Sequence, residues 1–133
     1  MIIKSIEDFV SHKDDRGEII NVAQDCDVLH IYSKKGVERA NHWHKTTSHL
    51  CLLIYGRMEY YERQVGTELK PAKLIIDSSA LFYTGPQLEH TMYFLEPSLF
   101  ICHSFGKRDQ ESYEKDLVRL PYSLKKIYDD WKP

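Results

Sequence analysis

The stretch from Gly36 to Gly56, GVERANHWHKTTSHLCLLIYG, places three histidines between two glycines. Its spacing is G-x5-H-x-H-x4-H-x6-G, with the histidines at positions 42, 44 and 49. His42 and His44 are two residues apart, so on a strand they point to the same face. A turn at residues 45–48 would return the chain in a second, neighbouring strand and bring His49 beside this pair. Three imidazoles that converge in this way can bind a transition metal ion.

The composition is that of a folded, nearly neutral chain. The 133 residues include 42% hydrophobic residues, and 18 Lys and Arg against 20 Asp and Glu give a net charge of -2. This balance gives no sign of a nucleic-acid or membrane-surface partner. No apolar run approaches a membrane span, and the start, MIIKSIEDFV, is too short and too acidic for a signal peptide. Cysteines at positions 26, 51 and 102 form no CxxC pair and indicate reduced thiols. We expect one cytoplasmic domain spanning residues 1–133.

Short strands separated by turns recur about every 8–12 residues along most of the chain. We expect them at residues 18–23, 28–32, 38–44, 49–55, 58–63, 73–77, 80–83, 90–95 and 99–105. This pattern predicts an antiparallel sandwich or barrel. After residue 109 the pattern allows one or two helical turns that stop at Pro121. Leu124, Ile127 and Trp131, spaced by three and four, predict a short C-terminal helix on the outside.

The histidine stretch resembles the first motif of the cupin superfamily, G-x5-H-x-H-x3/4-E-x6-G, with His49 where glutamate is usual. TGPQLEH, ending at His90, is similar to the second motif, although Pro86 is displaced by one position and Gln87 takes the place of a glycine. The resemblance implies an all-β fold, an antiparallel double-stranded β-helix or jelly roll. It also implies one divalent transition metal ion (Zn, Fe, Ni or Mn) inside the barrel, with the ligands His42, His44, His49 and His90.

Other segments resemble those of the cupin sugar-nucleotide epimerases and the dTDP-4-keto-6-deoxyhexose 3,4-ketoisomerases. They are DDRGEIINV at 14–22, RANHWHK at 39–45 and the acidic, tyrosine-containing tail DQESYEKDLVRL at 109–120. The resemblance implies a small-molecule substrate such as a nucleotide sugar, and a role in deoxysugar or surface polysaccharide biosynthesis. Those isomerases usually work without a metal and have no histidine at the position of His49, so this chain would belong to a metal-using sister group.

The four-histidine set has a chemical consequence. Neutral imidazoles leave the charge of a bound cation uncompensated, which makes it a stronger Lewis acid and favours an anionic ligand such as an enolate or a carboxylate. Octahedral coordination would leave two positions for substrate, whereas tetrahedral coordination would leave none and make the site structural. Both remain open on the sequence.

Further residues are candidates for substrate contacts. Arg16 and Arg39 could clamp a phosphate or carboxylate, or could be plain turn or surface arginines. His30 and Tyr32 share a strand face and are candidates for acid–base catalysis if that face looks into the barrel. The alternative is an outer sheet face or a dimer contact. His103 alternates with its apolar neighbours and is a catalytic candidate on the same condition.

Three functions remain open. The first is a metal-dependent sugar-nucleotide isomerase or epimerase, which moves a proton next to a keto group. The second is a non-haem iron dioxygenase of a small molecule, and the third is a metal- or ligand-binding cupin without turnover. We favour the first. The exposed edges and aromatic faces of so small a barrel also predict a homodimer.

Overall fold

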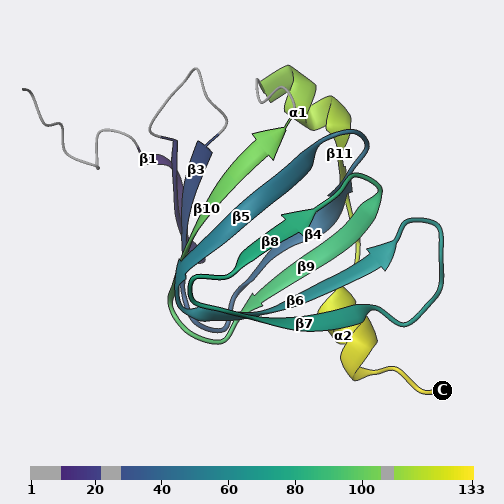
Figure 1. The fold of residues 1–133 in the computed structure, drawn as a ribbon. Helices are drawn as coiled ribbons and strands as arrows, with labels where there is room; N and C mark the ends of the chain where they lie inside the picture. The colour runs from purple at the N-terminus through teal and green to yellow at the C-terminus, as the bar shows by residue number, and fades with distance from the viewer. Residues whose placement is uncertain (1–9, 22–27, 106–109) are drawn as a thin grey trace, which may run out of the picture.

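A computed structural model of the chain describes residues 10–21, 28–105 and 110–133. Within these ranges the chain forms two antiparallel sheets that face each other (Figure 1). The first sheet has six strands in the order β1-β2-β3-β10-β5-β8, and the second has five in the order β11-β4-β9-β6-β7. Strands that are neighbours in sequence therefore often lie in different sheets. This architecture is the jelly roll that the strand spacing and the cupin resemblance predicted.

The strand bounds follow the expected positions closely, except that a strand at residues 117–119 replaces the end of the helical turns expected up to Pro121. The first sheet contains β1 Val10–Asp14, β2 Gly17–Asn21, β3 Val28–Ser33, β10 Ser98–Phe105, β5 Ser48–Tyr55 and β8 Leu81–Thr84. The second contains β11 Leu117–Arg119, β4 Glu38–His44, β9 Leu88–Phe94, β6 Arg57–Gln64 and β7 Ala72–Asp77. Cys26 and the end of the strand expected at 18–23 lie outside the described residues.

The core fills the space between the two sheets, because alternate residues of each strand point inward. In β3 the inward residues are Leu29 and Ile31, and in β5 they are His49, Cys51 and Leu53. Cys51 therefore lines the barrel as a small buried residue. The buried cluster combines Leu29, Ile31, Cys51, Leu53, Met58, Tyr60, Ile76, Phe82, Met92, Phe94, Phe100 and Cys102.

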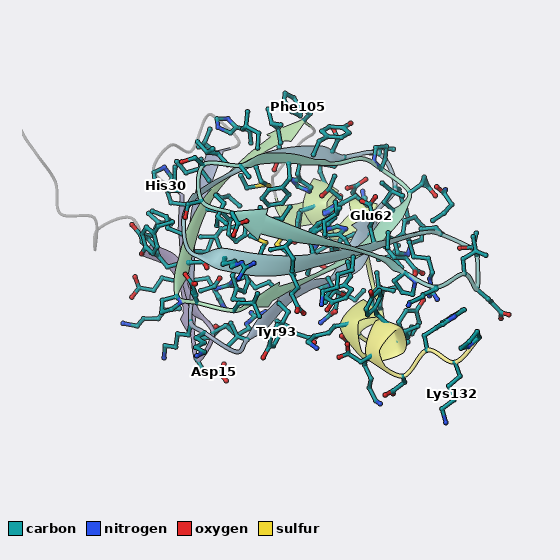
Figure 2. All side chains as sticks on the ribbon, turned by 60° about the horizontal axis from the view of Figure 1, so that its bottom comes forward. Asp15, His30, Glu62, Tyr93, Phe105 and Lys132 are labelled. Carbon is teal, nitrogen blue, oxygen red and sulfur yellow. The ribbon has the colours of Figure 1, made fainter. Side chains whose placement is uncertain are left out.

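The same alternation places the candidates His30, Tyr32 and His103 on the outer face of the first sheet. His30 and Tyr32 alternate with the buried Leu29 and Ile31, and His103 is exposed next to the buried Cys102. Figure 2 shows His30 at the outer flank of the molecule. The structure therefore does not meet the condition under which these three residues were candidates for catalysis in the barrel.

Two short helices follow the barrel strands. α1 spans Gln110–Asp116 and leads directly into β11, which pairs with β4. α2 spans Leu124–Asp129 and packs outside β6 and β9, as expected for the C-terminal helix (Figure 1). Ser123 caps α2 by accepting a hydrogen bond from the Lys126 amide, and Leu124 is fully buried beneath it.

Candidate metal centre

A cavity of about 460 Å³ lies between the two sheets, within the size range of small-molecule sites. Its polar wall contains the histidines 42, 44 and 49 and the arginines 16, 39 and 119. Its apolar wall comes from core residues such as Leu29, Ile31 and Phe100. The cavity thus combines an apolar interior with a few convergent polar groups, the usual character of a binding site.

A β-bulge in β4 directs the polar side chains into this cavity. Ala40 pairs with Thr91 and His42 with His90, so Asn41 is an extra residue without a partner in the ladder. Both bulge residues have a left-handed backbone, with φ of 70° at Ala40 and 54° at Asn41. Arg39 and His42, three residues apart, would point to opposite faces of a regular strand. The bulge brings both to the cavity.

His42, His44 and His90 form a compact group of nitrogen ligands. Each offers one ring nitrogen, and these three atoms all lie within 4.8 Å of one another. His90 comes from β9 and pairs directly with His42 of β4, so the two sit side by side in the same sheet. Their ring centroids are 4.7 Å apart. The donor set suits zinc, iron, nickel or copper, which favour imidazole.

The hydrogen bonds made by Nδ1 of two of these histidines place the lone pair of the ring on the other nitrogen, Nε2. His90 Nδ1 donates to the carbonyl oxygen of Leu88 at 3.1 Å. His44 Nδ1 donates to the carboxylate of Asp116 at 2.8 Å. A neutral imidazole that donates from Nδ1 carries its lone pair on Nε2. Such partners on the far ring nitrogen are usual for metal-binding histidines.

The surroundings keep His42 and His90 neutral, as metal binding requires. Burial is the main cause that lowers the pKa of His90 to about 3, and His44 and His49 lower it further. Burial and the neighbouring histidines, His90 first, hold the pKa of His42 well below its ordinary value. Both side chains therefore carry no charge at pH 7, and the residues fit a bound cation.

His49 reaches this group from the opposite sheet. The sequence suggested that its strand lies beside that of His42 and His44, but this expectation was wrong. β5 pairs with β10 and β8, whereas β4 pairs with β9 and β11. The turn at 45–48 crosses from one sheet to the other. His49 nevertheless lies close to His44, as expected: the two Nε2 atoms are 3.0 Å apart across the cavity.

The two predicted arginines both reach the cavity, in different states. Arg39 is buried, and its guanidinium donates to Ser33 Oγ at 2.7 Å and to the Tyr32 carbonyl oxygen at 3.0 Å. Burial, with repulsion from Arg16, lowers the pKa of Arg39 to about 10, so it stays charged at pH 7. Arg16 is more exposed and forms an ion pair with Asp14 at 2.6 Å. The cavity therefore carries two fixed positive charges from these residues.

Sequence reasoning missed four polar residues of the site, one of which, Tyr113, lines the cavity from α1. Arg119 lines the cavity from β11 and pairs with Glu114 through two bonds of 3.0 Å. Asn41 lines it at the bulge, where its side chain accepts from Thr91 Oγ1. Asp116 supports His44 from 72 positions further along the chain. The acidic tail was noted in the sequence, but no local pattern singles out Asp116, because only the folded chain brings it to His44.

Comparisons with known proteins show the fold. No family model and no curated protein matches the sequence. Among solved structures, the chain is similar to the capsular polysaccharide assembling protein CapF from Staphylococcus aureus, with a TM-score of 0.71 and 20% identity over 80% of this chain. It covers 30% of that CapF chain, so it spans about a third of the length of this relative.

Two further similar structures are enzymes. One is a double mutant of the QdtA 3,4-ketoisomerase from Thermoanaerobacterium thermosaccharolyticum in complex with TDP, with a TM-score of 0.59, 18% identity and coverage of 93% of this chain and 94% of that one. The other is the dTDP-4-dehydrorhamnose 3,5-epimerase from Sulfolobus tokodaii, with a TM-score of 0.61, 18% identity and coverage of 92% and 77%.

These likenesses, all below 25% identity, show that the chain has the cupin fold. They confirm the superfamily resemblance at the level of the fold. In the part of the chain that the structure describes, no helix has the length and apolar character needed to cross a membrane.

Proposed function

We propose that this cupin-fold chain is a metal-dependent isomerase or epimerase of a nucleotide sugar, acting in deoxysugar or surface polysaccharide biosynthesis. The observation that carries the proposal is a cluster of three imidazole nitrogens, two of them from residues in the wall of a cavity that two charged arginines also line. Cupin-fold proteins of similar structure include a 3,4-ketoisomerase with bound TDP and a sugar-nucleotide 3,5-epimerase, which supports this substrate class.

The chain would hold one divalent transition ion through His42, His44 and His90, with His49 as a fourth ligand. The spacing between His44 Nε2 and His49 Nε2, 3.0 Å, equals that of two nitrogens that bind one ion at right angles at about 2.1 Å. When bound, the ion would polarise a keto oxygen and so acidify the neighbouring C–H group. Zinc, iron, nickel and manganese remain candidates.

The arginines would hold the anionic part of the substrate. Arg39 presents a charged, planar group whose orientation is fixed by Ser33 and the Tyr32 carbonyl. A fixed guanidinium binds phosphate oxygens in pairs and loses little entropy on binding. Arg16 lines the same cavity. Together they would place the diphosphate and leave the sugar ring facing the histidines.

The proton next to the keto group needs an acceptor on the cavity wall. Tyr113 of α1 lines the cavity, and its ring lies 6.1 Å from that of His44. His49 does not serve as this acceptor, because in this proposal its Nε2 binds the ion while its Nδ1 faces Ser104. We assign proton transfer to Tyr113 rather than to His30, Tyr32 or His103, since those three lie on the outer sheet face.

Hydrogen–deuterium exchange tests the proposal directly. The full chain, loaded in turn with each candidate metal, is incubated in D₂O with a dTDP-4-keto-6-deoxyhexose, and the proton signals of the sugar are followed by NMR. We expect metal-dependent loss of the signal at the carbon next to the keto group. No exchange with any metal, together with no binding of dTDP, would contradict the proposal.

An iron dioxygenase is the second candidate, because the ligand group contains no carboxylate among the described residues. All-histidine ligation leaves iron with open positions for a small substrate and oxygen. Oxygen consumption by the Fe(II)-loaded chain with small-molecule substrates, without exchange in the sugar assay, would favour it over the isomerase. Metal binding without either activity would favour a binding cupin.

Three further properties are part of this proposal. We propose a homodimer formed through the outer face of the first sheet, where His30 of β3, Ile101 of β10, Leu52 of β5 and Leu81 of β8 form one row across four strands. We propose a cytoplasmic location, in line with the sequence-based expectation of reduced thiols. The extent of the domain, residues 1–133, also stays a prediction.

A further inference from the structure

We propose that Asp116 is a positioning residue that fixes the tautomer of His44. It holds the ring proton on Nδ1, so that Nε2 directs a lone pair towards the metal centre. The inference rests on the proposed metal centre, to which it adds a residue from outside the barrel. Asp116 is the last residue of α1, which lies at one end of the barrel (Figure 1).

The turn between β4 and β5 surrounds one oxygen of the Asp116 carboxylate. Oδ1 accepts from the Thr46 amide at 2.8 Å, from Thr46 Oγ1 at 2.8 Å and from the Thr47 amide at 3.3 Å. The Lys45 amide also donates to the backbone carbonyl of Asp116 at 3.0 Å. These bonds hold the carboxylate in one orientation, so its other oxygen, Oδ2, points at His44 Nδ1.

An ionised carboxylate can only accept hydrogen bonds, so the 2.8 Å contact requires a proton on His44 Nδ1. Burial raises the pKa of Asp116, but the bonds from Thr46, Thr47 and His44 outweigh it and hold the pKa well below its usual range. In the neutral ring that metal binding requires, the lone pair of His44 then lies on Nε2.

The same constraint extends to His49. Since His44 Nε2 is an acceptor, the 3.0 Å contact between the two Nε2 atoms requires His49 to donate from Nε2 in the metal-free protein. His49 Nδ1 then accepts from Ser104 Oγ at 2.9 Å or from Cys102 Sγ at 3.3 Å. Each group in this series therefore donates to the next one on the way to Asp116: Ser104 or Cys102 to His49, His49 to His44, and His44 to the carboxylate.

This direction separates the roles of the histidines. His44 and His90 each present a lone pair on Nε2 before any metal arrives, because a fixed acceptor holds the proton on Nδ1. His49 can join as a ligand only after its proton moves from Nε2 to Nδ1, where Ser104 Oγ can accept it. Asp116 thus places the lone pair of His44 on Nε2, whereas His49 must change its tautomer before it can act as a ligand.

Asp116→Asn reverses the tautomer without changing the size of the side chain. Three donors meet Oδ1, so the asparagine keeps its carbonyl oxygen there and turns its NH₂ group towards His44 Nδ1. His44 must then accept at Nδ1 and carry its proton on Nε2. We expect the affinity for zinc, measured by competition with a chelating dye, to fall about 10–100-fold, as for other changes of a ligand's hydrogen-bond partner.

Nitrogen-15 NMR of the imidazole rings in the metal-free protein is the second readout. We expect the Nδ1–H tautomer for His44 in the wild type and the Nε2–H tautomer in Asp116→Asn. Glu111→Gln is the matched control, because it removes the same charge from the same helix and Glu111 contacts Lys115 instead. The control should keep the wild-type tautomer and affinity.

The two readouts separate the possible failures. If His44 has the Nε2–H tautomer in the wild type, the inference is overturned without any variant. It is also overturned if a folded Asp116→Asn keeps the same His44 tautomer as the wild type. A wild type that binds no metal overturns the proposed metal centre and with it the ligand role, while the NMR result still reports on Asp116. Equal zinc affinity of a folded Asp116→Asn and the wild type would also refute the positioning role.

Discussion

His44 Nε2 and His49 Nε2 lie 3.0 Å apart, although the two histidines belong to strands of different sheets. The contact joins the two walls of the barrel at the candidate metal centre. One side leads through His44 to Asp116 and the turn at 45–48, and the other leads through His49 to Ser104 of β10. The site is therefore built from both sheets and from the segment after the barrel.

Metal content should depend on the inward histidines. We expect His42→Ala and His90→Ala to lose bound metal, because each removes one of the three clustered nitrogens. His103→Ala should keep it, since His103 is exposed on the outer face. Elemental analysis of tag-free protein loaded with zinc measures this directly. Equal metal content in all three variants would refute the centre.

The metal-free protein should lose stability in mild acid. The folded pKa of His90 is about 3, below the ordinary value of 6.5, so the unfolded chain takes up the proton first as the pH falls. Stability is complete above about pH 6.5 and falls by about 1.4 kcal/mol per pH unit below it for this histidine alone. Urea unfolding between pH 7.5 and 4.5 measures the slope, in the presence of a chelator.

This pH window lies above the range in which the carboxylates contribute. The lowered pKa of Asp116 affects stability only as the pH falls below about 3.8, its ordinary value. His90→Gln should therefore give a shallower slope between pH 6.5 and 4.5. A variant slope equal to that of the wild type would show that His90 is not the group responsible.

Substrate binding should depend on the planar guanidinium group of Arg39. Arg39→Lys keeps the charge but loses the paired donors, so we expect at least about tenfold weaker binding of dTDP. Arg57→Lys is the control, because Arg57 lies on the surface and pairs with Asp77. Isothermal titration calorimetry provides the comparison. If both variants bind like the wild type, Arg39 does not contact the nucleotide.

The dimer should depend on the outer face of the first sheet. Leu81 is 66% exposed on β8, and Leu69 is 67% exposed in the loop before β7. We expect Leu81→Asp to convert the dimer to a monomer in sedimentation experiments at micromolar concentration, because a buried, unpaired charge is costly. Leu69→Asp, with a matched exposure, should leave the dimer intact. A monomeric wild type would exclude the interface.

Gly56 should be far less replaceable than Gly66. Both have a left-handed backbone, with φ of 102° and 78°. A Cβ at Gly56 would lie 2.7 Å from Ser98 Cα, whereas one at Gly66 would meet nothing within 4 Å. We expect Gly66→Ala to cost about 1 kcal/mol in unfolding free energy through backbone strain alone. Gly56→Ala should cost clearly more, and equal costs in thermal or urea unfolding would contradict the predicted clash.

The sequence by itself determined most of the strands and identified three of the histidines that meet at the candidate metal centre. Alternating apolar residues and turns predicted an antiparallel sandwich or barrel, because the side-chain period of a strand is a local property, and the cupin resemblance narrowed this to the jelly roll. The two-residue spacing placed His42 and His44 on one face, and the turn at 45–48 returned His49 to their vicinity. The outer position of His30 could not be read in the same way, since alternation alone does not say which face is buried.

Only the tertiary structure decided how the site is completed. The bulge at Asn41 placed Arg39 and His42 on the same side of β4, whereas residues three apart in a regular strand point to opposite faces. The crossing of the chain between sheets set His49 opposite His44 instead of beside it. Asp116 met His44 because α1 folds back over the end of the barrel, a contact between residues 72 positions apart. These relationships depend on long-range packing, which local spacing in the sequence does not encode.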